Sequence, residues 1–115
     1  MKLTQATITI AVCLTFSAAA SAGSPSLDVG FSPEGSALQL VIRTIDDARE
    51  SIRLMGYSFT SPEIVRALVA AKRRGVDVRV VVDDKGNHSK ASQAEMNIIV
   101  NADIPLRTNS QYRIM

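Results

Sequence analysis

Apolar residues recur along the chain with two different spacings. Four runs are dense in apolar and β-branched residues and predict strands at residues 27–31, 51–59, 76–83 and 104–108. Between these runs, apolar residues repeat at three- and four-residue steps and predict helices at residues 33–48, 62–74 and 89–101. The predicted order therefore alternates strand and helix along the chain.

The helix ends carry signals of their own. Ser32 and Ser61 can each cap a helix, because a serine oxygen accepts a hydrogen bond from a free N–H of the first turn. A proline and a glutamate follow each serine, and they suit the first helical position and the positive end of the helix dipole. Gly75 stands where a left-handed cap would end the second helix. The residues predicted to face inward are Ala37, Leu40, Val41, Ile45 and Ala48, then Ile64, Val65, Leu68 and Ala71, then Ala91, Ala94, Ile98 and Val100.

This alternation predicts an α/β fold with mainly parallel strands, because helices then connect neighbouring strands. The run at residues 51–59 is mostly apolar, so we expect a strand covered on both faces. Pro105 cannot donate a hydrogen bond to a neighbouring strand, which places the last predicted strand at an edge or limits Pro105 to its start.

The composition is that of one small globular domain. The 115 residues are 46% hydrophobic and 21% charged, with a formal net charge of +2. The basic residues are spread out except for Lys72, Arg73 and Arg74. That run would suit contact with a nucleic-acid backbone, but a helix C-terminus alone explains it and is the preferred interpretation.

The first 22 residues have the pattern of a secretory signal peptide, with Lys2 at the start, an apolar stretch and the cleavage site Ala20-Ser21-Ala22. An N-terminal anchor helix is the alternative, but the apolar run is shorter than the about 20 residues that a membrane span needs. We therefore expect residues 23–115 to be an exported domain, periplasmic or secreted, with no stable membrane span. Cys13 is the only cysteine and lies in the signal, so the mature chain can form no disulfide.

Polar residues at the predicted strand ends are the candidates for a binding site. We expect Tyr57, Ser58, Thr60 and Asp83 to lie near a substrate, because ligands collect at the carboxyl ends of strands in α/β sheets. Asp83 and Asp84 would also suit a Mg²⁺ ion. A solvated turn and ordinary packing are the alternatives for these residues. No cofactor is predicted.

Five segments, in this order, resemble small exported nucleases of the phospholipase D superfamily. They are residues 31–37 (FSPEGSA), 51–53 with 57–62 (SIR and YSFTSP), 67–79 (ALVAAKRRGVDVR), 80–83 with the Gly86-Asn87 loop (VVVD and GN), and 104–108 (IPLRT). The resemblance implies a phospholipase D-like βαβαβαβ sheet sandwich. It also implies a metal-independent phosphodiesterase that forms a phosphohistidine intermediate and pairs two copies across a two-fold axis.

In that family, the catalytic residues are a His-x-Lys, an Asp and a later Gly-Ser…Asn segment. The alignment places the first histidine just beyond Met115, so no catalytic residue can be assigned to this sequence. We therefore expect residues 23–115 to be the N-terminal part of the domain, truncated before the catalytic strands and inactive alone. His88-Ser89-Lys90, with Glu95, resembles the motif in spacing but follows the wrong strand, and we expect a solvated histidine near a helix start.

The expected function is thus hydrolysis of phosphodiester bonds, in nucleic acid by preference and in phospholipid as the second possibility. A non-catalytic fragment and a Mg²⁺-dependent α/β binding domain are the remaining alternatives.

Overall fold

The computed structural model describes residues 25–112, and they form three helices, three strands and one short 3-10 turn. In chain order these are α1 (Ser36–Asp47), β1 (Ser51–Gly56), α2 (Pro62–Arg73), β2 (Asp77–Asp83), η1 (Lys85–Asn87), α3 (Lys90–Asn101) and β3 (Leu106–Asn109). The predicted α/β class is confirmed. The predicted signal peptide, with its cleavage site, lies outside the described residues.

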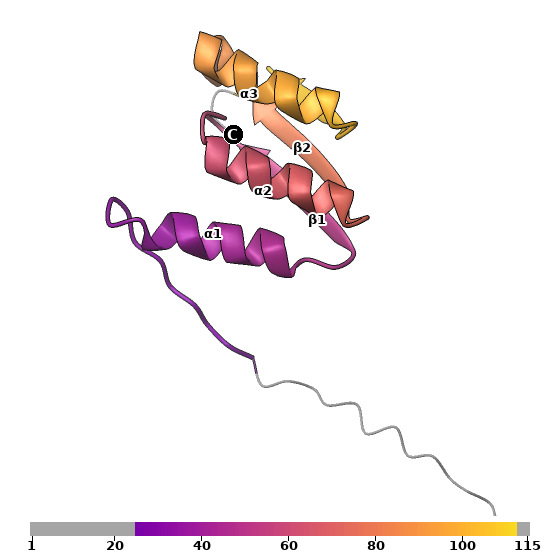
Figure 1. Cartoon of the computed structure of the whole chain (residues 1–115). Coiled ribbons are helices and arrows are strands. Elements are labelled where there is room, and N and C mark those ends of the chain that lie inside the picture. Colours follow the sequence, from indigo (N-terminus) through magenta and orange to yellow (C-terminus); the bar gives the residue numbers. More distant parts are fainter. Residues whose placement is uncertain (1–24, 113–115) are drawn as a thin grey trace, which may run out of the picture.

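The strands form one parallel sheet in which they lie in chain order, β1-β2-β3. Ser51 pairs with Asp77 at one end of the β1–β2 register, and Asp83 pairs with Asn109 at the end of β2 and β3. Crossover connections of parallel strands share one hand, so a sheet that adds its strands in one direction places their helices on one face. Figure 1 shows this arrangement, with α2 and α3 in front of the strands and α1 beside α2.

The core lies between this face of the sheet and the helices. Its buried side chains are Ile45, Phe59, Val65, Ala67, Leu68, Ala71, Val76, Val78, Val80, Val82, Ile99 and Ile104. Even-numbered residues of β2 point into this core, because side chains alternate between the faces of a strand.

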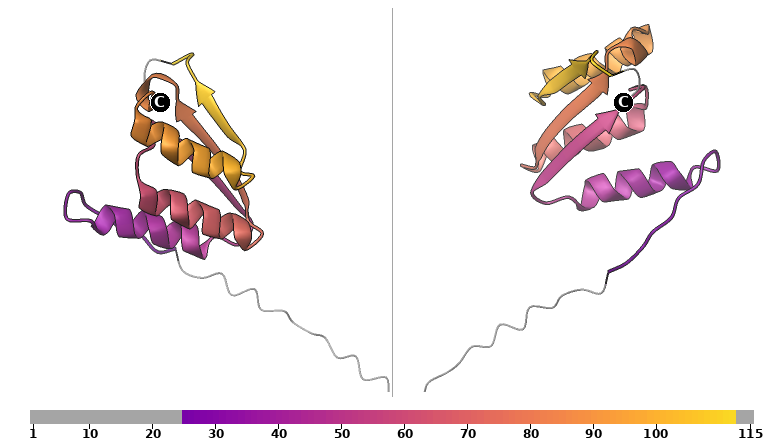
Figure 2. Two further views of the ribbon diagram at one scale, coloured as in Figure 1. Left: turned by 45° about the horizontal axis from the view of Figure 1, so that its top comes forward. Right: turned by 180° about the vertical axis from the view of Figure 1, so that it is seen from behind.

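The opposite face of the sheet has no helix over it among the described residues, as the view from behind in Figure 2 shows. The expectation that β1 is covered on both faces is therefore wrong. Along β1 the side chains alternate between exposed and half-buried, and Met55 is 72% exposed.

The segment at residues 27–31 is not a strand, and here the prediction is wrong. Leu27, Val29 and Phe31 are exposed and pair with no strand. Phe31 instead stands at the beginning of the bend that leads into α1, where its carbonyl accepts a 3.0 Å hydrogen bond from the N–H of Ala37. Its own N–H donates to the Ser36 hydroxyl at 2.8 Å.

Helix α1 begins at Ser36, three residues later than predicted, and Ser32 does not cap it. Its N-cap is Gly35, whose φ of 88° is a left-handed conformation that glycine adopts without strain. By contrast, Ser61 caps α2 as predicted, with its hydroxyl accepting from the N–H of Ile64, and Gly75 takes the expected left-handed conformation at φ 92°.

Helix α3 starts with the cap Ser89 but packs with a different face from the one predicted. Ala91, Ala94, Ile98 and Val100 are exposed, whereas Ser92 and Ile99 are buried and Met96 is half-buried. Ser92 can be buried because its hydroxyl lies 2.9 Å from that of Ser89. A polar residue with a local partner thus took the inward position that an alanine was expected to take.

Candidate functional site

The carboxyl ends of the three strands meet at one edge of the sheet, because the strands are parallel. The N–H of Asp84 continues the pairing beyond β2 with a 3.0 Å hydrogen bond to the carbonyl of Asn109. The loop that follows β1, the η1 loop that follows β2 and the start of α2 and α3 therefore gather there (Figure 1).

Asn87 holds the loops of this edge together. Its side-chain carbonyl accepts a 2.7 Å hydrogen bond from the N–H of Phe59. Its amide nitrogen donates to the carbonyls of Tyr57 and Asp83, each at 2.6 Å. Asn87 is 3% exposed, so these bonds replace water that the side chain has lost. The residue fixes the loop after β1 against the loop after β2.

Asp83 lies in the same buried cluster. It is 1% exposed, and one of its carboxylate oxygens accepts a 2.7 Å hydrogen bond from the N–H of Gly86. Gly86 approaches Tyr57 so closely that a Cβ added to it would lie 2.8 Å from the Tyr57 carbonyl oxygen. Glycine at this position therefore lets the η1 loop pack against the loop after β1.

The four residues predicted to lie near a substrate are at this edge, but their side chains differ in exposure to solvent. Tyr57, Ser58 and Thr60 are exposed, whereas Asp83 is buried and bonded to the η1 loop. The geometry therefore leaves the first three available to a ligand. Asp83 holds the loop from within.

Asp83 and Asp84 have different partners. The bonded oxygen of Asp83 faces Gly86, and a carboxylate oxygen of Asp84 lies 3.6 Å from the Nε2 atom of His88. Within residues 25–112, no group of three or more His, Cys, Asp and Glu side chains is arranged to hold a metal ion. The pair of aspartates thus offers no converging ligand set for Mg²⁺.

His88 lies at the end of η1, on the surface. Its side chain is 70% exposed, and its Nε2 atom lies 3.6 Å from a carboxylate oxygen of Asp84. Lys90 and Glu95 follow on α3, outside the sheet, so the His88-Ser89-Lys90 triplet does not lie on a strand.

The three basic residues at the end of α2 have different roles in the fold. The guanidinium group of Arg74 donates to the carbonyls of Ile45 and Asp46, at 3.0 and 3.1 Å, and so caps the C-terminus of α1. Cations are favoured at that end of a helix by its dipole. Arg74 therefore joins two helices, and only Lys72 and Arg73 are left for other contacts.

No local sequence pattern identifies Asn87 and Gly86 as the residues that organise this edge. The loop Asp84-Lys85-Gly86-Asn87 was visible, but the burial of its asparagine depends on the close approach of the loop after β1. That approach follows from the pairing of β1 with β2, which no local pattern reveals.

Comparison with known proteins places this fold among its relatives. A family model described as "Cardiolipin synthase, PLD-like domain" matches residues 41–115, which is well over half of the chain. The chain belongs to the phospholipase D-like family. The resemblance read from the sequence is thereby confirmed.

Solved structures agree with the family assignment. A phospholipase D family member, Nuc from Salmonella typhimurium, is 59% identical and superposes with a TM-score of 0.77 over 79% of this chain and 60% of its own. NucT from Helicobacter pylori is 29% identical, with a TM-score of 0.54 over 67% of this chain and 48% of its own. The phospholipase D-like fold is therefore shown.

Two curated relatives are each described as "Phospholipase D". The protein from Rickettsia prowazekii is 32% identical over 63 residues and that from Rickettsia conorii is 33% identical over 63 residues. This chain spans 31% and 32% of their lengths. The phospholipase D-like chain thus corresponds to part of each relative. Among the residues that the structure describes, no helix has the length and apolar character to cross a bilayer.

Proposed function

We propose that the protein is an exported phosphodiesterase of the phospholipase D-like family that hydrolyses nucleic acids. One observation supports this most strongly, namely 59% identity and a TM-score of 0.77 to the phospholipase D family member Nuc. The export rests on the signal pattern of residues 1–22. Hydrolysis of a phospholipid head-group ester is the second candidate, because the Rickettsia relatives are described as phospholipases D.

The proposed chemistry is that of the family. A histidine nitrogen attacks phosphorus, the bond from phosphorus to the leaving alkoxide breaks, and a second histidine gives the alkoxide its proton. Water then attacks the phosphohistidine and releases the phosphate monoester together with the free imidazole. No metal or other cofactor takes part, and a homodimer brings two copies of the motif together.

We further propose that residues 1–115 supply scaffold and substrate contacts but not the reacting groups. The sequence has one histidine, and His88 is exposed, lies 3.6 Å from a carboxylate oxygen of Asp84 and follows a 3-10 turn. The mechanism needs a nucleophile and an acid held against one phosphate, and an isolated surface imidazole does not provide them. Tyr57, Ser58 and Thr60 are the proposed substrate contacts.

Substrate choice is tested by comparing two reactions of the protein as its gene encodes it. Plasmid DNA cleavage is followed on gels and choline release from phosphatidylcholine by a coupled assay, both in EDTA. We expect DNA cleavage that EDTA does not inhibit. Efficient choline release without DNA cleavage would overturn the nuclease assignment.

Three further experiments separate the remaining alternatives. Residues 1–115 produced alone should show no cleavage, and a His88→Ala variant of the active protein should keep full activity. Loss of activity in that variant would make His88 catalytic.

A thermal melt in Mg²⁺ and in EDTA should give the same midpoint, whereas stabilisation by Mg²⁺ would support a magnesium-binding domain instead.

A further inference from the structure

The loop that follows β1 holds two aromatic side chains, and they differ in exposure. Phe59 is 5% exposed and belongs to the core, whereas Tyr57 is 49% exposed. The loop stands at the carboxyl edge of the sheet, where a substrate is proposed to bind. The Tyr57 ring therefore offers a large, flat surface to a ligand at this edge.

The η1 loop holds Tyr57 in place. The side-chain nitrogen of Asn87 donates a 2.6 Å hydrogen bond to the Tyr57 carbonyl. The ring also packs against Gly86, because a Cβ added to that glycine would lie 3.3 Å from the ring atom Cε2. A side chain that is already held loses little conformational entropy when a ligand binds. Tyr57 is thus a pre-formed contact surface.

Hydroxyl groups accompany the ring. Ser58 and Thr60, in the same loop, are exposed. Serine and threonine hydroxyls donate hydrogen bonds to phosphate oxygens, and aromatic rings stack on nucleobases. A ring flanked by hydroxyls therefore matches two parts of a nucleotide, the base and the phosphate. A choline group would instead be enclosed by several aromatic rings, and this loop exposes one.

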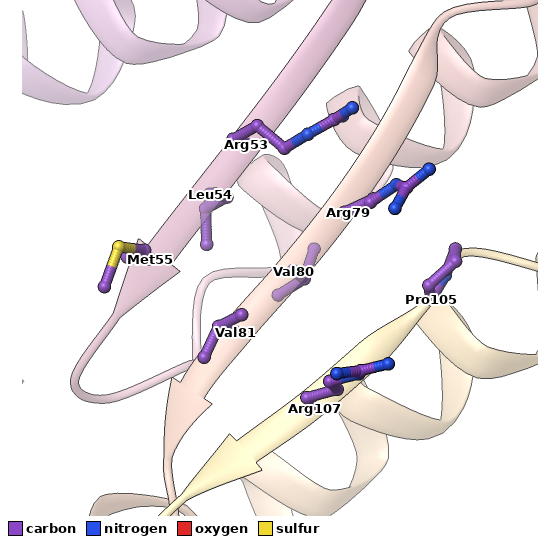
Figure 3. Close-up of a pocket in the computed structure, with 8 residues that line it drawn as sticks. All are labelled: Arg53, Leu54, Met55, Arg79, Val80, Val81, Pro105 and Arg107. Carbon is purple, nitrogen blue, oxygen red and sulfur yellow. The ribbon is translucent and has the colours of Figure 1, made fainter.

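The face of the sheet that carries no helix differs in this respect. Figure 3 shows a hollow on that face, with Arg53, Arg79 and Arg107 among its lining residues. Guanidinium groups can contact phosphates, but none of the residues that line this hollow is aromatic. A base therefore finds no aromatic ring there, and the loop after β1 is the better place to hold it.

We propose that Tyr57 stacks on an unpaired nucleobase beside the scissile phosphate and thereby favours single-stranded nucleic acid as the substrate. The inference rests on the proposed function, because it assigns a role to one of the proposed substrate contacts. Every base has a π-face, so the stacking tolerates any sequence. In a duplex the bases already stack on one another, and a base must first leave the stack to reach Tyr57.

The test compares two substrates that differ only in their bases, using the protein as its gene encodes it. One is a fluorescent thymidine oligonucleotide of about 12 nucleotides, and the other has the same phosphates but an abasic sugar at every position. Steady-state cleavage of both is measured for the wild type, Tyr57→Leu, Tyr57→Phe and Ile98→Ala. Ile98 is 47% exposed on α3, outside the candidate site, and serves as the control.

We expect the wild type to cleave the thymidine oligonucleotide with a kcat/KM about tenfold or more above that for the abasic one, because stacking of one base on an aromatic side chain contributes that much. The advantage should lie in KM. Tyr57→Leu should lose most of this advantage, whereas Tyr57→Phe, which keeps the ring, and Ile98→Ala should retain it.

A second readout does not depend on cleavage. The 115 residues contain no tryptophan, so in a Tyr57→Trp variant of this chain the indole fluorescence reports on this one position. The thymidine oligonucleotide should quench this fluorescence, and the abasic one should not. This readout remains decisive if Tyr57→Leu does not fold.

Other outcomes overturn the inference. Equal kcat/KM of the wild type for both oligonucleotides, or an advantage that survives in Tyr57→Leu, excludes stacking on Tyr57 while cleavage of DNA still supports the proposed function. An equal loss on both substrates in Tyr57→Leu shows that Tyr57 serves packing only. If the wild type cleaves neither oligonucleotide, the proposed function itself fails.

Discussion

The side chain of Asn87 accepts a hydrogen bond from the backbone N–H of Phe59, 28 residues earlier, at 2.7 Å. Because Asn87 also donates to the carbonyls of Tyr57 and Asp83, one buried amide satisfies three backbone groups from two loops. The edge of the sheet where a substrate is proposed to bind is therefore built around a single side chain.

Replacing Asn87 should destabilise the protein substantially. Asn87→Ala leaves three backbone groups without their partners, and we expect a loss of about 2–4 kcal/mol in the free energy of unfolding. Urea denaturation followed by circular dichroism measures it. Asn97→Ala, at an exposed position in the middle of α3, is the matched control and should change stability by less than about 0.5 kcal/mol. Equal effects of the two changes would contradict the role of Asn87.

A pair of glycine substitutions tests the close approach of the two loops. In Gly86→Ala the new Cβ would lie 2.8 Å from the Tyr57 carbonyl oxygen, so backbone must move, at a cost of about 1–3 kcal/mol. In Gly56→Ala the nearest atom is a Leu54 side-chain carbon at 3.7 Å, an ordinary contact. Thermal unfolding of both variants should show a lower midpoint for Gly86→Ala alone.

Arg74 should matter for stability, whereas its neighbour Arg73 should not. Arg74→Met keeps most of the aliphatic chain but removes the two hydrogen bonds that cap α1, at a cost of about 1–2 kcal/mol. Arg73→Met removes an exposed charge from the same turn of α2. Urea midpoints of the two variants give the comparison, and an equal loss in both would mean that charge near the helix end matters rather than the cap.

The ion pair between Arg53 and Asp77 should make the stability of the fold depend on pH. The Arg53 guanidinium lowers the pKa of the Asp77 carboxyl, and Arg79 adds to the effect. Because the folded pKa is below the unfolded one, the stabilisation is complete above the ordinary pKa of an aspartate and is lost as the pH falls through the lowered value.

This pKa can be followed directly by carbon-detected NMR of the Asp77 carboxyl. We expect Arg53→Gln to raise the pKa of Asp77 towards its ordinary value. Arg107→Gln, on the neighbouring strand β3 and without an ion pair to Asp77, should leave the pKa of Asp77 unchanged. A pKa of Asp77 that does not respond to Arg53→Gln would exclude the guanidinium as the cause.

A helix or strand was predicted correctly where the residues that determine it lie within that element. The β-branched run around Val78 gave β2, and the cap Ser61 with Pro62 gave the start of α2. The predictions were wrong where contacts between residues far apart in the sequence determine the structure. The run at Leu27 has strand composition but no neighbour to pair with, and α3 turned Ser92 inward because Ser89 could satisfy its hydroxyl.

The positions of the candidate residues along the strands could be predicted, but their burial and hydrogen bonds could not. The predicted strand ends put Tyr57 and Asp83 at the carboxyl ends of neighbouring strands, and the structure has them there, after β1 and at the end of β2. Their contact with a substrate stays a prediction. The sequence did not show that Asp83 is buried or that Asn87 bridges the loops, because both depend on how closely the loops after β1 and β2 approach.

The strand order β1-β2-β3 also bears on how the domain folds. Each strand pairs with the one made just before it, so every new strand–helix unit can join a surface that already exists. Contacts between units that are close in sequence carry a small loop-closure cost and favour rapid folding. The sheet can therefore grow from β1 in step with the chain, with β3 as its growing edge.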